Sequence, residues 1–165
     1  MAGTGDLEVL RICRYLRSRV SVSPHNVITY GSHLATHMAL GLLFLGGGKY
    51  TLSTTSEAIA ALIIAFYPQF PIHSNDNRYH LQAFRHLYIL ATEPRIILPR
   101  DIDSGDLCYV HLKVIFLDSK YYQNQHYTVK APCLLPKLSL LKEVRVEDGR
   151  YWSIVFERDR NWDKL

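Results

Sequence analysis

The sequence predicts an α+β fold, with helix pairs in residues 1–92 and an incomplete β-rich domain in residues 93–165. Hydrophobic residues recur every three to four positions in the first part and every two positions in the second. The density of charge also changes, because residues 1–92 carry 7 basic and 4 acidic side chains whereas residues 93–165 carry 12 and 11. Both parts stay near neutral, so we interpret this step as a change of architecture.

The first part is expected to form four helices, bounded by residues that begin or end helices. Asp6 is the expected N-cap of the first helix, and Ser32 opens the second. Glycines end the second helix and Pro68 ends the third, because glycine accepts the left-handed C-cap conformation and proline cannot continue a helix. The expected helices span residues 6–18, 32–45, 56–67 and 77–92, and residues 21–29 are expected to form a loop.

The fourth helix is expected to begin at a cap formed by Asn75 and Asp76 and to end before Pro94. A period of 3.6 residues divides its side chains into two faces. The inward face is expected to hold Leu81, Phe84, Leu87, Tyr88 and Ala91. The outward face is expected to hold Arg78, Gln82 and Arg85.

The second part contains short runs rich in Val, Ile, Tyr and Phe, separated by turn-forming residues. The turn at residues 147–150 lies between two such runs and indicates a hairpin. The aspartates at positions 101, 103 and 106 lack the spacing of a calcium loop and are expected to form a turn. The clearest alternations are Val110, Leu112, Val114 and Phe116, and then Trp152, Ile154 and Phe156. The expected strands span residues 95–98, 108–117, 127–130, 142–146 and 151–157.

Glycine-rich turns recur along the first part. Gly3 and Gly5 precede one helix, and Gly46 and Gly48 lie 43 residues further on. The unit between them holds a helix pair, which is typical of an α-solenoid whose repeats bury each other's apolar faces. We expect Gly46–Gly48 to end a helix with at least one residue at positive φ. Because no helix precedes the first glycine turn, we also expect the chain to be a piece of a longer protein.

Residues that carry chemistry in other proteins do not complete a site here. His33 and His37 have the spacing of two zinc ligands, but Leu34 stands where zinc proteases carry a glutamate. The run Gly46–Lys49 follows a helix, whereas a phosphate-binding loop follows a strand. The three cysteines form no Cys-x-x-Cys pair and are interpreted as small apolar side chains.

Composition argues against several classes of partner. The longest apolar run, residues 58–67, is shorter than the roughly 18 residues that span a bilayer. The 19 basic and 15 acidic side chains form no long basic cluster, so the net charge of +4 does not indicate a nucleic-acid-binding face. We expect no membrane, nucleic-acid or small-molecule partner and no cofactor.

Two long strings carry a resemblance to a known family. They are His37–Gly48 (HMALGLLFLGGG) and Asp76–Tyr88 (DNRYHLQAFRHLY), with shorter matches at residues 50–54, 59–62 and 93–95. In these strings the chain resembles the family of the large scaffold subunit of the anaphase-promoting complex (cyclosome), subunit 1. Weaker likeness extends over nearly the whole chain.

The resemblance implies the end of a proteasome/cyclosome-type repeat solenoid in residues 1–92 and the partial start of a β-rich C-terminal domain in residues 93–165. It implies a non-catalytic scaffold in a multi-subunit ubiquitin ligase that marks mitotic regulators for degradation. The other subunits of that complex are then the expected partners, with localisation in the nucleus and cytoplasm. The expected structural repeat glycines are Gly3, Gly5, Gly41, Gly46, Gly47 and Gly48.

Two alternatives stay open at this stage. A proteasome-base scaffold would share the solenoid, although the Asp76–Tyr88 string and the β-rich part argue against it. A small metal-dependent hydrolase would use His33 and His37 as metal ligands.

Overall fold

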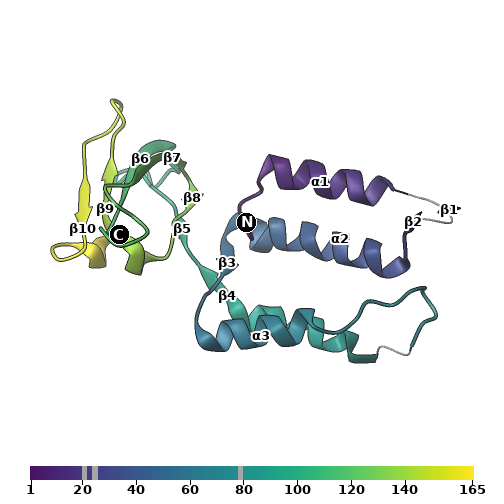
Figure 1. Ribbon diagram of the computed structural model, residues 1–165. Coiled ribbons are helices and arrows are strands. Elements are labelled where there is room, and N and C mark those ends of the chain that lie inside the picture. Colours follow the sequence, from purple (N-terminus) through teal and green to yellow (C-terminus); the bar gives the residue numbers. More distant parts are fainter. Residues whose placement is uncertain (20–21, 24–25, 78–79) are drawn as a thin grey trace. The chain divides into compact units, whose positions relative to one another are not determined.

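The computed structural model describes residues 1–19, 22–23, 26–77 and 80–165 as a mixture of helix and sheet. The described residues form two compact units, Met1–Pro94 and Arg95–Leu165. Helices dominate the first unit and antiparallel strands dominate the second (Figure 1).

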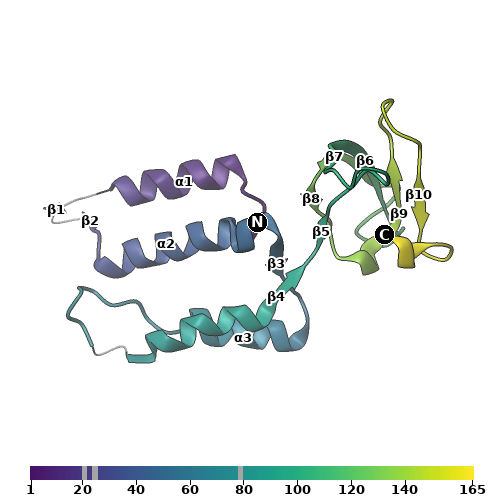
Figure 2. The same cartoon turned by 180° about the vertical axis from the view of Figure 1, so that it is seen from behind.

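The first unit contains two pairs of neighbouring helices. Helix α1 packs along α2, and α3 packs along the 3₁₀ helix η2; both arrangements can be followed from the front and from behind (Figures 1 and 2). Strands β3 and β4 pair antiparallel, so Tyr50 lies opposite Pro94. The elements are α1 (Leu7–Ser18), β1 (Val22–Ser23), β2 (Asn26–Val27), α2 (Tyr30–Leu43), η1 (Leu45–Gly48), β3 (Tyr50–Leu52), α3 (Ser56–Phe66), η2 (His80–Ala91) and β4 (Thr92–Pro94).

Polar side chains begin the three α-helices. The carboxylate of Asp6 accepts a hydrogen bond of 2.9 Å from the backbone N–H of Val9, which confirms the predicted cap of α1. The second helix begins at Tyr30 with Thr29 as its N-cap, so the prediction that Ser32 opens it is wrong. The side-chain hydroxyl of Thr29 accepts from the backbone N–H of Ser32 at 3.2 Å, so the cap lies three residues earlier than expected.

The fourth helical segment differs most from its prediction. It is a 3₁₀ helix that begins at His80, not an α-helix from residue 77, and residues 78–79, including Arg78, lie outside the described residues. The predicted cap by Asn75 and Asp76 stays a prediction, because the residues that it would cap lie outside the described part; one oxygen of the Asp76 carboxylate accepts from the backbone N–H of Ile72 in the preceding loop. In a 3₁₀ helix, side chains three residues apart share a face. Residues 82, 85, 88 and 91 therefore form one row, in which Arg85 and Ala91 are buried.

This change of period reverses part of the predicted burial pattern. Leu81 and Phe84, expected to point inward, are 44% and 47% exposed. Arg85, expected to point outward, is only 5% exposed. Leu87 and Tyr88 are half-buried and Ala91 is buried, in agreement with the prediction.

The second unit is built on a four-stranded antiparallel sheet in the order β10-β9-β6-β7. A separate pair of short strands, β5 and β8, lies beside it in the fold, and β9 and β10 form the expected hairpin. The elements are β5 (Ile96–Ile97), β6 (Val110–Phe116), β7 (His126–Ala131), β8 (Cys133–Leu134), η3 (Leu138–Leu140), β9 (Leu141–Val146), β10 (Val155–Glu157) and η4 (Trp162–Lys164).

The core of the second unit lies on one face of this sheet. Val110, Leu112 and Val114 are buried with strand period, as the alternation predicts. The second predicted alternation is wrong, because β10 begins at Val155 and Trp152 lies outside any strand, 90% exposed. Ile154 is also exposed, and only Phe156 packs against the core.

Candidate functional site

The two glycine-rich turns of the first unit contact each other. The backbone N–H of Gly3 donates to the carbonyl of Leu42 at 2.9 Å, and that of Gly5 donates to Leu43 at 3.0 Å. These carbonyls belong to the last turn of α2, where no partner is available within the helix. The first turn therefore satisfies the end of α2, a role that the sequence spacing alone did not predict.

The run Gly46–Gly48 follows α2 and has φ values of 58°, 68° and 82°. This confirms the predicted positive φ at the end of the helix. A Cβ on Gly46 would lie 2.3 Å from Cδ2 of Tyr50, whereas a Cβ on Gly47 would meet no described atom within 4 Å. Glycine is needed at position 46 for two reasons: its φ is positive, and the ring of Tyr50 lies too close for a side chain.

Gly41 differs from the other five predicted glycines. It lies inside α2, and it is absent from the positive-φ glycines of the described chain. A Cβ built on it meets no described atom within 4 Å. Nothing within the described fold therefore requires a glycine at this position.

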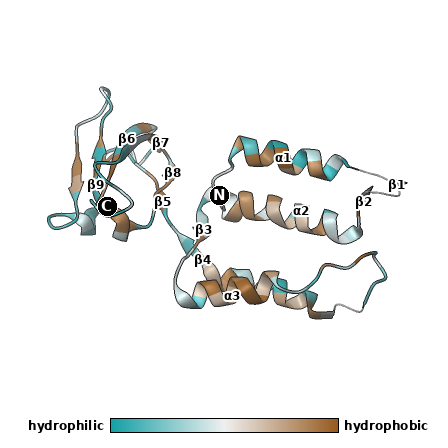
Figure 3. Ribbon diagram, in the orientation of Figure 1, coloured by the Kyte–Doolittle hydropathy of each residue, from teal (hydrophilic) through white to brown (hydrophobic). Residues whose placement is uncertain are grey.

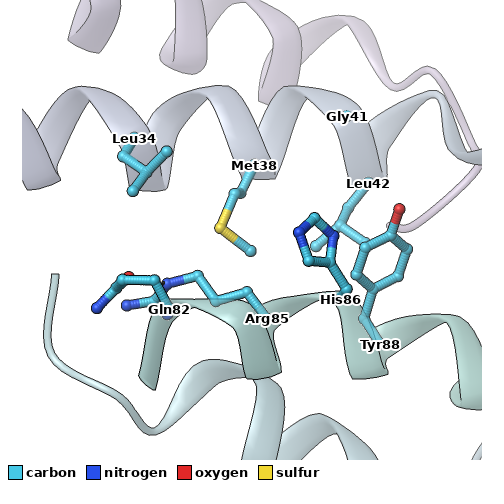
Figure 4. A pocket seen from close by; sticks show the side chains of 8 residues that line it. All are labelled: Leu34, Met38, Gly41, Leu42, Gln82, Arg85, His86 and Tyr88. Atoms are coloured by element: carbon cyan, nitrogen blue, oxygen red, sulfur yellow. Dashed lines mark hydrogen bonds between the residues drawn. The ribbon is translucent and has the colours of Figure 1, made fainter. Parts of the chain in front are cut away.

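Gly41 lines a cavity of about 380 Å³ between α2 and η2 (Figure 4). Helix α2 contributes an apolar wall, and the thioether of Met38 points into the space between the helices. Helix η2 contributes a wall of polar side chains. The other lining residues are Leu34 and Leu42 from α2, and Gln82, Arg85, His86 and Tyr88 from η2.

Arg85 forms the buried part of the polar wall and joins η2 to the end of α3. Its guanidinium donates to the carbonyl of Pro68 at 2.6 Å and to that of Ala65 at 3.4 Å. Its Nε donates to the side chain of Gln82 at 2.6 Å. A cation is favoured at a helix C-terminus, where carbonyl groups have no helical partner. Burial lowers the pKa of Arg85 from its ordinary value.

The second unit carries an apolar surface around the hairpin. Ile102 is 96% exposed and Trp152 is 90% exposed, and both line a cleft of about 310 Å³ with Tyr151 and Ile154. Large apolar side chains that gather in one exposed region are typical of protein contact surfaces. The alternation of Trp152, Ile154 and Phe156 predicts a strand and therefore does not reveal this surface.

A charged cluster holds the hairpin turn against β6. The carboxylate of Asp148 accepts from Nε of Arg150 at 3.0 Å and from the backbone N–H of His111 at 3.2 Å. Arg150 also donates to the carbonyl of Tyr109 at 2.6 Å. Hydrogen bonds from Arg150, and then from His111, hold the pKa of Asp148 well below its usual range.

The three cysteines are free thiols, and Cys13 is buried. Burial raises the pKa of Cys133 to about 11. Burial, and then the neighbouring thiolate of Cys133, raises the pKa of Tyr127 to about 12. A thiol that stays protonated at neutral pH is a poor nucleophile, so Cys133 acts as an apolar side chain.

His33 and His37 both lie on α2, half-buried and exposed respectively. In the described part of the chain, no group of three or more His, Cys, Asp or Glu side chains is placed to hold a metal ion. The arrangement does not favour the hydrolase alternative.

The aspartate run at residues 101–106 forms a turn, in which Asp101 accepts from the backbone N–H groups of Asp103 and Ser104. Among the described helices, none has the length and apolar character needed to cross a membrane.

Both parts of the chain match models of one protein family. Residues 1–93 match a model described as the APC1 fifth domain, and residues 95–165 match a model described as the APC1 beta sandwich domain.

Similar proteins from several organisms align with nearly all of this chain. The chain is 49% identical over 165 residues to anaphase-promoting complex subunit 1 of Homo sapiens, which is 100% of this chain and 8% of that protein. It is 44% identical over 163 residues to the Schizosaccharomyces pombe protein of that name, 99% of this chain and 10% of that protein. A negative regulator of mitosis from Emericella nidulans is 48% identical over 161 residues, 98% of this chain and 7% of that protein.

The chain thus spans no more than 10% of the length of each of these three relatives. The first family model alone covers more than half of the chain, and the identity to the human relative extends over all 165 residues. The chain belongs to the anaphase-promoting complex subunit 1 family.

Proposed function

We propose that the chain forms part of a non-catalytic scaffold subunit of the anaphase-promoting complex, a multi-subunit ubiquitin ligase that directs mitotic regulators to degradation. The observation that carries this proposal is the 49% identity to the human subunit over every residue of the chain. In this assignment the residues of the chain bind other proteins, and ubiquitin transfer belongs to cullin-like and RING subunits.

The pairs α1–α2 and α3–η2 are proposed to be successive units of a solenoid. The buried side chains of α3 are Ala58, Ala61 and Ala65, whereas Ile59 and Ile63 are exposed. Figure 3 shows the hydrophobic character of α3 along its length. A helix that exposes large apolar side chains is stabilised when a neighbouring repeat covers them. This surface supports a stacked arrangement in the longer protein.

Other subunits of the complex are the proposed partners. The exposed Ile102 and Trp152 of the second unit supply apolar area of the kind that protein interfaces bury at their centre. Membership of this complex also leads us to propose localisation in both the nucleus and the cytoplasm.

Co-purification tests the proposed assembly. The gene product that contains this chain is tagged at its own locus and purified from dividing cells under gentle salt conditions. Recovery of cullin-like and RING subunits in amounts comparable to the tagged protein supports the proposal. Recovery of the tagged protein without them contradicts it. A second tagged version carrying Trp152→Ala and Ile102→Ala measures the contribution of the second unit, with Tyr121→Ala as an exposed control outside the cleft.

A further inference from the structure

We draw no further inference here: the strongest candidate, the open apolar cleft between α2 and η2, carries nothing, because nothing in the structure shows what covers it and the guanidinium of Arg85 in its wall is already held by two backbone carbonyls and the Phe70 ring.

Discussion

The guanidinium of Arg85 lies 3.6 Å above the centroid of the Phe70 ring. The same group donates hydrogen bonds to carbonyls at the end of α3, so one side chain joins η2, α3 and the loop after α3. A stacked and hydrogen-bonded guanidinium keeps a charge stable at a position that is almost fully buried.

Replacing this group tests its role in the first unit. Arg85→Met is expected to lower the free energy of unfolding by about 3 kcal/mol, because two carbonyls lose a charged donor and the ring loses its cation. Urea unfolding followed by circular dichroism at 222 nm reports the helices. Tryptophan fluorescence is the internal reference, since Trp152 and Trp162 both lie in the second unit.

The matched control is Arg11→Met on α1, where Arg11 pairs with Glu8 at an exposed position. Exposed ion pairs contribute little, so this variant is expected to stay within about 0.5 kcal/mol of the parent chain. Equal effects of the two substitutions would show that Arg85 has no special structural role.

The glycine turn after α2 provides a second test. Gly47→Ala is expected to cost about 1 kcal/mol from left-handed strain, whereas Gly46→Ala adds a clash with Tyr50 and is expected to cost about 2 kcal/mol. Both values come from urea unfolding curves. Combining Gly46→Ala with Tyr50→Ala removes the clash, so the extra cost is expected to disappear in the double variant. If the cost persists without the ring, the close approach of Tyr50 is not its cause.

The features of the fold that the sequence predicts correctly are those that depend on residues close together in the chain. The cap at Asp6, the glycine turn and the alternation in β6 were predictable, because short-range rules determine them. The burial of Arg85 was not predictable, because the hydrophobic pattern of this segment predicts an α-helical period whereas the chain forms a 3₁₀ helix. The cost of burying the Arg85 charge is offset by hydrogen bonds to two backbone carbonyls that lie 17 and 20 residues away in sequence.

The candidate site was only partly visible in the sequence. Gly41 was identified within a family-like string, but its neighbours across the cavity come from η2, more than 40 residues further on. Trp152 carries strong β propensity, yet it follows the turn in which Arg150 donates to Asp148, and it lies before the start of β10 at Val155. Contacts between residues far apart in sequence depend on how the elements pack, and the spacing of residue types along the chain carries no information about that packing.

Asp148 makes the stability of the second unit depend on pH. Its folded pKa is depressed by Arg150 and His111, so its contribution is fully present above the pKa of about 3.9 of an unfolded aspartate and declines as pH falls below that value. Asp148→Asn is therefore expected to be less stable than the parent chain at pH 7. The difference is expected to shrink as pH is lowered from about 4 towards 2.

Tryptophan fluorescence during urea unfolding at a series of pH values measures this difference. The exposed Asp103→Asn serves as control and is expected to change the free energy of unfolding by less than about 0.5 kcal/mol at pH 7. A constant gap between Asp148→Asn and the parent chain from pH 7 to pH 2 would rule out the depressed carboxyl pKa.

The raised pKa of Cys133 predicts low thiol reactivity. A rise from 9.0 to about 11 lowers the thiolate fraction at pH 8 about a hundredfold. A thiolate of higher pKa is also more nucleophilic, which offsets about tenfold of this loss. Iodoacetamide alkylation followed by mass spectrometry is therefore expected to modify Cys133 at least about tenfold more slowly in the folded chain than in urea. Comparable rates in the two states would mean that the thiol is neither buried nor protonated as described.

The scaffold role is tested most directly by removing the subunit and asking whether the others stay together. A tag is placed on the cullin-like subunit, the gene product that contains this chain is depleted from dividing cells, and the remaining subunits are quantified by mass spectrometry after purification. The account predicts that the recovered subunits divide into smaller groups and that re-expression of the parent gene restores their association. An assembly that remains intact, with unchanged subunit ratios after complete depletion, would contradict it.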